Sequence, residues 1–296
     1  MPSPEPARKS WHGSFTPGRH FLKMHGLQNH FVIVDGRDDP YRPGRDDIVR
    51  ICDPRTGVGA DQLVIITTPT DAGKNEGAAA RVEFWNVDGR EVEACGNATR
   101  CVAWLLLEEA ATDEVRVETR AGVLRCCRTG PQRVSSEMGR IRTGWRDIPL
   151  STERDTCHLE IRMGPLRDPV ALNIGNPHVV FFADRSDDLD AIDLSVLAPP
   201  VQENPLFPEQ VNVGVAQMQS DTRMRLRVFE RGAGLTMACG SGACVAVFAA
   251  LSRGLTDYRR MTVELPGGEL DIEIQPDGSA VMSGPVAFCF SGTLPR

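Results

Sequence analysis

The chain has 296 residues, of which 41% are hydrophobic and 25% charged, and its formal net charge is −7. This composition is typical of a soluble globular protein, and the length predicts two domains of ordinary size. The chain has no basic block and no interleaved aromatic and basic residues, so its negative charge argues against nucleic-acid binding. Gly and Pro make about 17% of the residues, against roughly 12% in an average protein, which favours short strands and turns over a helical bundle.

The first residues, MPSPEPARKSWHGSFTPGRH, are polar and rich in Pro, without the apolar core of a secretory signal. No apolar stretch of the sequence approaches the roughly 20 residues of a membrane span. The nine cysteines are an odd number and lack the spacing of a small disulfide scaffold. We therefore expect a cytoplasmic protein with free thiols, no membrane partner and a disordered N-terminal extension over residues 1–20.

Strand and helix patterns follow this extension. In chain order we predict a strand at 30–35, a helix at 46–53, strands at 61–68 and 81–87, a helix at about 97–109, a hairpin over 114–127, strands at 158–163, 177–184, 210–219 and 225–231, a helix at about 240–252 and a hairpin over 259–275. The second and third helices are apolar on most faces, which is typical of buried helices. Residues 128–155 are rich in Gly, Pro, Ser and Thr, and we interpret them as the crossing between two domains.

Two pairs of segments indicate an internal repeat. "GLQNHFVIVD" resembles "IGNPHVVFFAD", and "VEFWNVDGREVEACGNATRC" resembles "LRVFERGAGLTMACGSGAC". The offsets agree, because Asn29 and Asn176 are 147 residues apart and Cys95 and Cys239 are 144 residues apart. We therefore predict a duplicated α/β unit, each copy rich in sheet around one apolar helix.

Each copy begins its apolar helix with a Cys-Gly step, at Cys95-Gly96 and at Cys239-Gly240. The positive end of the helix dipole and the unpaired backbone N–H groups favour the thiolate, which is the reactive form. Glycine beside the thiol allows a ligand to approach the backbone closely. If the copies face each other across a cleft, one thiolate and one thiol could remove and return a proton on opposite faces of a carbon centre.

A purely structural role is less plausible for Cys95 and Cys239 than for the other seven cysteines. A lone cysteine is usually a small buried hydrophobe, and we expect that role for Cys52, Cys101, Cys126, Cys127, Cys157, Cys244 and Cys289. The Cys-x5-Cys and Cys-x4-Cys spacings lack the paired ligands of a zinc site, so no metal is expected. The sequence has no P-loop and no GxGxxG after a strand, which leaves a nucleotide cofactor unsupported.

At these residues the sequence resembles the diaminopimelate epimerases, over roughly residues 21–294. The resemblance is carried by "FLKMHGLQNHFVIVD", "GVGADQL", "FWNVDGREVEACGNATRC", "NIGNPHVV", "FPEQVNVGV", "RVFERGAGLTMACGSGAC", "LPGGELDIE" and "MSGPVAF". It implies an α/β (α+β) fold of two pseudo-symmetric domains, each a mostly antiparallel sheet around a central helix, with the active site between them. The implied boundaries are 21–139, with a returning strand at 284–296, and 140–283.

The resemblance also implies the chemistry. A cofactor-independent isomerase, needing neither pyridoxal phosphate nor metal, would interconvert LL- and meso-diaminopimelate for lysine and peptidoglycan precursors, as a homodimer. Cys95 and Cys239 match the catalytic thiols, and His178 and Glu230 match residues that help to set the thiol pKa values. The residues that match substrate-binding positions are Asn29, Gln62, Asn86, Gly96, Asn97, Asn176, Asn212, Glu230, Arg231, Gly240 and Ser241.

These side chains suit a substrate with two amino-carboxylate ends. Neutral amides can pair with ammonium and carboxylate without acting as bases, and Arg231 suits bidentate contact with the distal carboxylate. The sequence departs from the family pattern at Gln28, His30 and Ala98, where the family reads GxGNDF and CGNGxRC. Two alternatives therefore stay open: a related racemase or epimerase for another amino acid, and a redox-responsive, non-catalytic relative.

Overall fold

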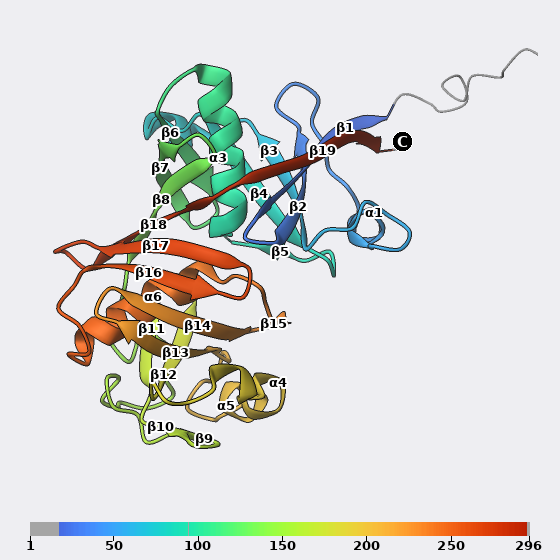
Figure 1. The fold of residues 1–296 in the computed structure, drawn as a ribbon. Helices are drawn as coiled ribbons and strands as arrows, with labels where there is room; N and C mark the ends of the chain where they lie inside the picture. The colour runs from blue at the N-terminus through green and yellow to red at the C-terminus, as the bar shows by residue number, and fades with distance from the viewer. Residues whose placement is uncertain (1–17, 94, 295–296) are drawn as a thin grey trace, which may run out of the picture.

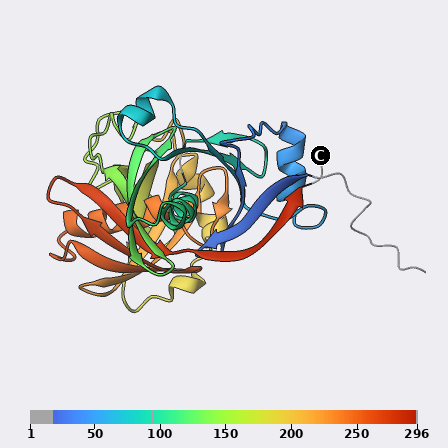
Figure 2. The ribbon, with the colours of Figure 1, turned by 90° about the horizontal axis from the view of Figure 1, so that it is seen from above.

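The computed structural model describes residues 18–93 and 95–294, and it has two lobes (Figure 1). One lobe holds α3 (Gly96–Ala110) and the other holds α6 (Gly240–Ser252). Figure 2 shows the green helix α3 nearly end-on, with strands curving around it. The expected fold class, a mixed α/β protein with a sheet around a central helix in each half, is confirmed.

We call residues 19–140 the first repeat and residues 170–285 the second repeat. The first repeat contains β1 (Arg19–Gly26), β2 (Asn29–Asp35), α1 (Arg45–Cys52), β3 (Gln62–Thr67), α2 (Asp71–Asn75), β4 (Ala80–Asn86), β5 (Glu91–Val92), α3, β6 (Glu114–Thr119), β7 (Gly122–Gly130) and β8 (Arg133–Arg140). The second repeat contains β11 (Val170–Asn173), β12 (Pro177–Ala183), a 3₁₀ helix η2 (Leu189–Ala191), α4 (Leu194–Leu197), α5 (Pro199–Gln202), β13 (Asn212–Ser220), β14 (Arg223–Glu230), β15 (Gly234–Leu235), α6, β16 (Arg260–Leu265), β17 (Gly268–Ile274) and β18 (Ser279–Pro285). A small ladder of β9 (Arg162–Met163) and β10 (Leu166–Arg167) lies between the repeats, and β19 (Ala287–Leu294) follows them.

The two repeats share one strand topology. In the first, β2 pairs antiparallel with β1 and parallel with β3, and β3 pairs antiparallel with β4. After α3 the chain returns as β6, parallel to β4, and continues into the antiparallel strands β7 and β8. In the second repeat, β11, β12, β13, β14, β16, β17 and β18 pair in the same order and directions. The predicted duplication is therefore confirmed strand by strand.

One strand pairing joins the repeats and a second adds β19, which gives one sheet of 17 strands. Strand β18 pairs antiparallel with β8, with Gly284 opposite Val134. Strand β19 pairs antiparallel with β1, with Ser291 opposite Leu22. The last strand of the chain therefore lies against the first strand, and β18 passes from one lobe to the other (Figure 1).

Each central helix is buried because apolar side chains cover most of its circumference. On α3, Ala98 and Val102 pack into the core with Phe31 and Phe84 of the surrounding strands. On α6, Ala243, Val247 and their neighbours pack against strands of the second repeat. Both helices are nevertheless short, and within the described ranges no helix has the length and hydropathy needed to cross a membrane.

The structure differs from the sequence-based expectations between residues 128 and 163. The expected crossing begins later, because residues 133–140 form β8, whose alternate residues Val134 and Ser136 are buried. The predicted strand at 158–163 is reduced to Arg162–Met163. Leu159 and Ile161 are buried in an irregular segment whose backbone bonds to the loop near Pro169 instead of to a neighbouring strand.

Most of the predicted extension, residues 1–17, lies outside the described residues, and β1 begins at Arg19.

Candidate active site

The structure brings the two Cys-Gly helix starts together. Cys95 is the N-cap of α3 and Cys239 the N-cap of α6, both with extended backbone. A Cβ atom added at Gly96 would lie 2.7 Å from Cε of Met282, and one at Gly240 would lie 2.6 Å from Sδ of the same side chain. The two helices therefore start on either side of one methionine of β18.

An amide bridges the two helix starts. Asn97 Nδ2 donates to the carbonyl of Ala238, the residue before Cys239, over 3.3 Å. The same Nδ2 donates to Asn29 Oδ1 over 3.2 Å, and Asn29 Oδ1 lies 3.9 Å from the Cys95 Sγ. The predicted residues Asn29, Cys95, Asn97 and Cys239 thus belong to one group of contacts.

Gln62 and Asn86 lie at the same edge of the first repeat. The pairing of β2, β3 and β4 places Gln62 opposite Asn86 and next to the start of β2, which begins with Asn29. Gln62 Nε2 donates to Asn86 Oδ1 over 2.9 Å. The buried Gln62 Oε1 has no hydrogen-bond partner among the residues that the structure describes. An ammonium group of a ligand would supply the missing donor.

The second repeat places a matching set beside Cys239. His178 and Asn212 lie opposite each other on β12 and β13. His178 Nε2 lies 3.0 Å from both Asn176 Oδ1 and the Ser241 hydroxyl. The Ser241 hydroxyl is in turn 3.5 Å from the Cys239 Sγ, so one hydroxyl connects the imidazole to the thiol.

Glu230 and Arg231 follow at the end of β14. The backbone N–H of Arg231 donates to Asn212 Oδ1 over 2.8 Å, and its exposed side chain donates from Nη1 to the Glu209 carbonyl over 2.8 Å. The Glu230 carboxylate accepts from the Thr236 hydroxyl. His178 is connected to Cys239 through the Ser241 hydroxyl, and Glu230 accepts a hydrogen bond from Cys239 itself. Among the described residues, no hydrogen bonds connect His178 to Cys95.

Burial dominates the electrostatics of the two thiols. It raises the pKa of Cys95 to about 11, and it raises the pKa of Cys239 well above the ordinary value. The N–H groups of Asn97 and Ala98 lower the pKa of Cys95, as expected for a helix N-terminus, but less than burial raises it. The helix starts therefore favour the thiolates as expected, but in the free protein burial outweighs their effect on the pKa.

The two predicted modulating residues have opposite pKa shifts. Burial lowers the pKa of His178 to about 3, helped by the positive charge of Arg231, so the imidazole is neutral at physiological pH. Burial raises the pKa of Glu230, while hydrogen bonds from Thr236 and Cys239 act in the opposite direction. The charge of Glu230 in turn raises the pKa of both cysteines.

The three departures from the family pattern have different consequences. Gln28 has a φ of 62°, in the left-handed region that favours glycine, and its side chain is exposed. Burial lowers the pKa of His30, followed by the positive charges of Lys23 and His25, so His30 is neutral. Ala98 is fully buried in α3 and packs in the core.

Sequence reasoning missed Asp61. Its Oδ2 accepts from Asn29 Nδ2 over 3.1 Å and from the backbone N–H of His30 over 2.6 Å. Asp61 therefore orients the Asn29 amide so that Oδ1 faces the cysteine. Its position next to Gln62 in the block "GVGADQL" was the available signal.

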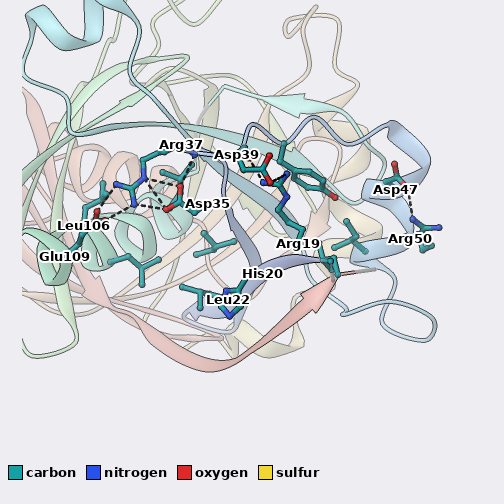
Figure 3. Close-up of a pocket in the computed structure, with 17 residues that line it drawn as sticks. Arg19, His20, Leu22, Asp35, Arg37, Asp39, Asp47, Arg50, Leu106 and Glu109 are labelled. Atoms are coloured by element: carbon teal, nitrogen blue, oxygen red, sulfur yellow. Dashed lines mark hydrogen bonds and ion pairs between the residues drawn. The ribbon is translucent and has the colours of Figure 1, made fainter. Parts of the chain in front are cut away.

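A separate cavity of about 710 Å³ lies in the first repeat (Figure 3). Its lining contains none of the predicted site residues. Its floor includes Leu22 and Leu106, and its charged side chains pair with each other, as Arg37 does with Asp35 and Glu109. The arginines that line this cavity are therefore paired with carboxylates of the same lining.

Known proteins resemble this chain over most of its length. The family model described as diaminopimelate epimerase matches residues 21–143 and 170–289. The diaminopimelate epimerase of Phenylobacterium zucineum is 48% identical over 282 residues, which cover 94% of this chain and 98% of that protein. The diaminopimelate epimerase of Acidiphilium cryptum is 44% identical over 276 residues, with 93% and 96% covered.

Solved structures support the fold. A phenazine biosynthesis protein of the PhzF family from Bacillus anthracis has a TM-score of 0.64 at 14% identity, covering 95% of this chain and 100% of that chain. A hydroxyproline epimerase from Agrobacterium vitis also has a TM-score of 0.64, at 15% identity, with 95% and 93% covered. The matched blocks include both Cys-Gly helix starts, and the chain belongs to the diaminopimelate epimerase family.

Proposed function

We propose that the protein is an isomerase that interconverts LL- and meso-2,6-diaminopimelate with Cys95 and Cys239 as its two acid–base groups. The observation that carries this proposal is the meeting of the two cysteine N-caps at Met282, bridged by Asn97. A substrate carbon between these helix starts has a thiol on either side. No cofactor is expected in this reaction.

In the forward direction, the thiolate of one cysteine removes the α-proton and becomes a thiol. The thiol of the other cysteine gives its proton to the opposite face of the carbon and becomes a thiolate. Negative charge that develops on the α-carboxylate would be stabilised by the N–H groups at the starts of α3 and α6. One negative charge therefore stays on the thiol pair, and the reverse reaction uses the exchanged roles.

The first thiolate must form although burial raises both thiol pKa values. A substrate ammonium between the thiols favours their charged form, since an opposite charge nearby lowers a thiol pKa. Neutral His178 supports this role, because its positively charged form would instead compete with the ammonium. His178 would act on Cys239 through the Ser241 hydroxyl, which lies within hydrogen-bond distance of both side chains.

Recognition of the two ends would be divided among the remaining predicted residues. Gly96, Asn97, Gly240 and Ser241 would hold the reacting end at the helix starts. The amides of Asn29, Gln62, Asn86, Asn176 and Asn212, together with Glu230 and Arg231, would hold the rest of the molecule. The unpartnered Gln62 Oε1 supports an ammonium contact on the side of the first repeat.

The protein is further proposed to act as a homodimer. Phe288 and Phe290 are each 48% exposed on β19, and Cys289 between them is exposed as well. An exposed apolar stretch on a terminal strand favours association with a second copy. The molar mass in solution, measured by light scattering for the wild type and for Phe290→Glu, tests this: a wild-type monomer would overturn it.

A cytoplasmic location is proposed from the nine cysteines, all of which are free thiols. The activity would serve lysine and peptidoglycan precursor synthesis.

The function is tested by a direct assay with LL-diaminopimelate under reducing conditions, with the isomers separated by chromatography. We expect meso-diaminopimelate to form in enzyme treated with a chelator and free of pyridoxal phosphate. Turnover of another amino acid at an equal rate would favour the related racemase, and absence of all turnover would favour the redox-responsive relative. Activity that appears only when metal is restored would contradict the cofactor-free mechanism.

A further inference from the structure

Arg100 is a fully buried cation next to the candidate site. It lies on α3, one turn beyond Cys95, and its exposed fraction is 0%. Its Nη2 donates to Asn97 Oδ1 over 2.8 Å, and its Nη1 donates to the thioether of Met282 over 3.3 Å. Its Nε has no hydrogen-bond partner among the described residues.

No carboxylate forms an ion pair with Arg100 in the described part of the chain. A buried charge without an acidic partner is costly, and a thioether is a weak acceptor. The ionisable groups that influence Arg100 most are the thiols of Cys101, Cys95 and Cys244, with Arg133 as a like charge. Among these thiols only Cys95 belongs to the candidate site, and the charge of Arg100 lowers the pKa of that thiol.

The surrounding backbone leaves room for this guanidinium. A Cβ atom added at Gly284 of β18 would lie 3.0 Å from both Cζ and Nη2 of Arg100. A Cβ atom added at Gly26 of β1 would lie 3.4 Å from Nη2. Three elements, α3, β1 and β18, thus enclose the side chain, which fixes its orientation.

The guanidinium also determines how the Asn97 amide is oriented, and Asp61 holds the neighbouring Asn29 amide in the matching orientation. Arginine can only donate hydrogen bonds, so the oxygen of Asn97 must face Arg100. The nitrogen of Asn97 must then face Asn29 Oδ1 and the Ala238 carbonyl, as the distances of 3.2 Å and 3.3 Å indicate. Asn29 Oδ1 lies 3.9 Å from the Cys95 Sγ. The amide that Arg100 orients, Asn97, therefore donates to the same oxygen that faces the thiol.

We propose that Arg100 is a positioning residue: it fixes the Asn97 amide between the two helix starts and supplies positive charge that favours the thiolate of Cys95. This inference rests on the proposed two-thiol reaction. In that reaction Cys95 is a thiolate in one direction, while the cation stays in place on α3, the helix that Cys95 begins. Burying Arg100 lowers the stability of the fold, and we infer that the residue is kept because the site needs its charge. Residues that are unfavourable for stability are common at active sites.

The test compares Arg100→Met and Arg100→Lys with the wild type. The first readout is the pH dependence of Cys95 alkylation by iodoacetamide without substrate, followed by peptide mass spectrometry. Arg100→Met removes the cation, so the alkylation midpoint should rise by about one pH unit or more. Its kcat should fall at least about tenfold, while its melting temperature stays equal or rises because a buried unpaired charge is gone.

Arg100→Lys keeps the charge and loses the planar fork. We expect an alkylation midpoint near that of the wild type and a lower kcat, because the Asn97 amide is no longer held. The control Arg90→Met removes an exposed arginine, with 81% of its side chain accessible, and should match the wild type in every readout. If Arg100→Met does not fold, Arg100→Gln, which also removes the charge, takes its place in the comparison with Arg100→Lys.

The proposal is overturned if either Arg100 variant keeps both the wild-type alkylation midpoint and the wild-type kcat. A midpoint raised equally in Arg100→Lys and Arg100→Met would overturn the role of the charge. Because alkylation needs no substrate, this comparison stands even if the wild type fails to epimerise diaminopimelate. In that case the reaction is wrong while the effect of Arg100 on the thiol is still measured.

Discussion

His178 and Cys239 are connected through a single hydroxyl. The Ser241 oxygen lies 3.0 Å from His178 Nε2 and 3.5 Å from the Cys239 Sγ. The same thiol accepts from the backbone N–H of Gly242 over 3.4 Å. A neutral imidazole therefore influences the thiol through a hydroxyl that can donate in either direction.

Replacing Ser241 by alanine should remove this connection. A hydrogen bond to a charged group contributes about 1.5–3 kcal/mol, so kcat should fall roughly tenfold or more while the protein stays folded. Steady-state kinetics and circular dichroism measure both. Ser252→Ala is the matched control, since Ser252 lies at the other end of α6 and its hydroxyl donates to the Phe248 carbonyl of the same helix. Equal kcat values for the two variants would refute the connection.

The pH dependence should reflect thiols and not the imidazole. The pKa of His178 is lowered to about 3, so it does not titrate between pH 5 and 8. The pKa of Cys95 is raised to about 11, so the thiolate fraction of the free enzyme increases as the pH rises. We expect kcat/KM to increase continuously from pH 6 to 9. An acid limb near pH 6.5 that disappears in His178→Asn would contradict this assignment.

Gly267 is expected to be essential for the fit between the repeats. Its N–H donates to the Met237 carbonyl, and an added Cβ atom would lie 2.1 Å from the Leu27 carbonyl oxygen. Gly267→Ala should therefore destabilise the protein by about 1–3 kcal/mol and displace the turn before Asn29, lowering activity as well. Gly130→Ala, where the nearest atom is 3.4 Å away, is the control. Thermal unfolding with equal midpoints would show that the turn is not fixed here.

Arg231 is expected to recognise the distal carboxylate. Arg231→Lys keeps the charge but loses the fork, so KM for diaminopimelate should rise about tenfold with a smaller change in kcat. Arg225→Lys, on β14 just before Arg231 and paired with Asp190, should leave both constants near the wild-type values. An unchanged KM in Arg231→Lys would remove this residue from the substrate site.

Much of the fold could be predicted from the sequence because the apolar patterns are strong and occur twice. The helices expected at 97–109 and 240–252 are present at Gly96–Ala110 and Gly240–Ser252. Strand β8 was missed because its two serines and its glycine suggest a loop, although pairing with β7 and β18 makes it a strand. Local composition does not reveal a strand that depends on two distant partners.

The candidate site could also be predicted only in part from the sequence. Motifs and their resemblance to a family indicated the two cysteines and the amides around them. Asp61 and Arg100 were missed, because their importance depends on contacts with Asn29 and Asn97 that only the folded chain forms. The effect of burial on the thiol pKa was not predicted, since a helix start can be recognised in a sequence whereas its depth of burial cannot.

The central claim is that Cys95 and Cys239 act on opposite faces of one carbon, so neither cysteine can replace the other. Serine keeps the shape of cysteine but is far less acidic, so Cys95→Ser and Cys239→Ser should each lower epimerisation by several orders of magnitude. The double variant should lose little more, because the two thiols act as a unit.

The most direct measurement is the deuterium content of both isomers early in the wild-type reaction in D₂O, determined by mass spectrometry. Each product molecule should carry one deuterium at the inverted carbon, because its proton comes from the opposite thiol, while recovered substrate stays unlabelled. Equal early labelling of recovered substrate and product would show that one base serves both faces and would contradict the two-thiol mechanism.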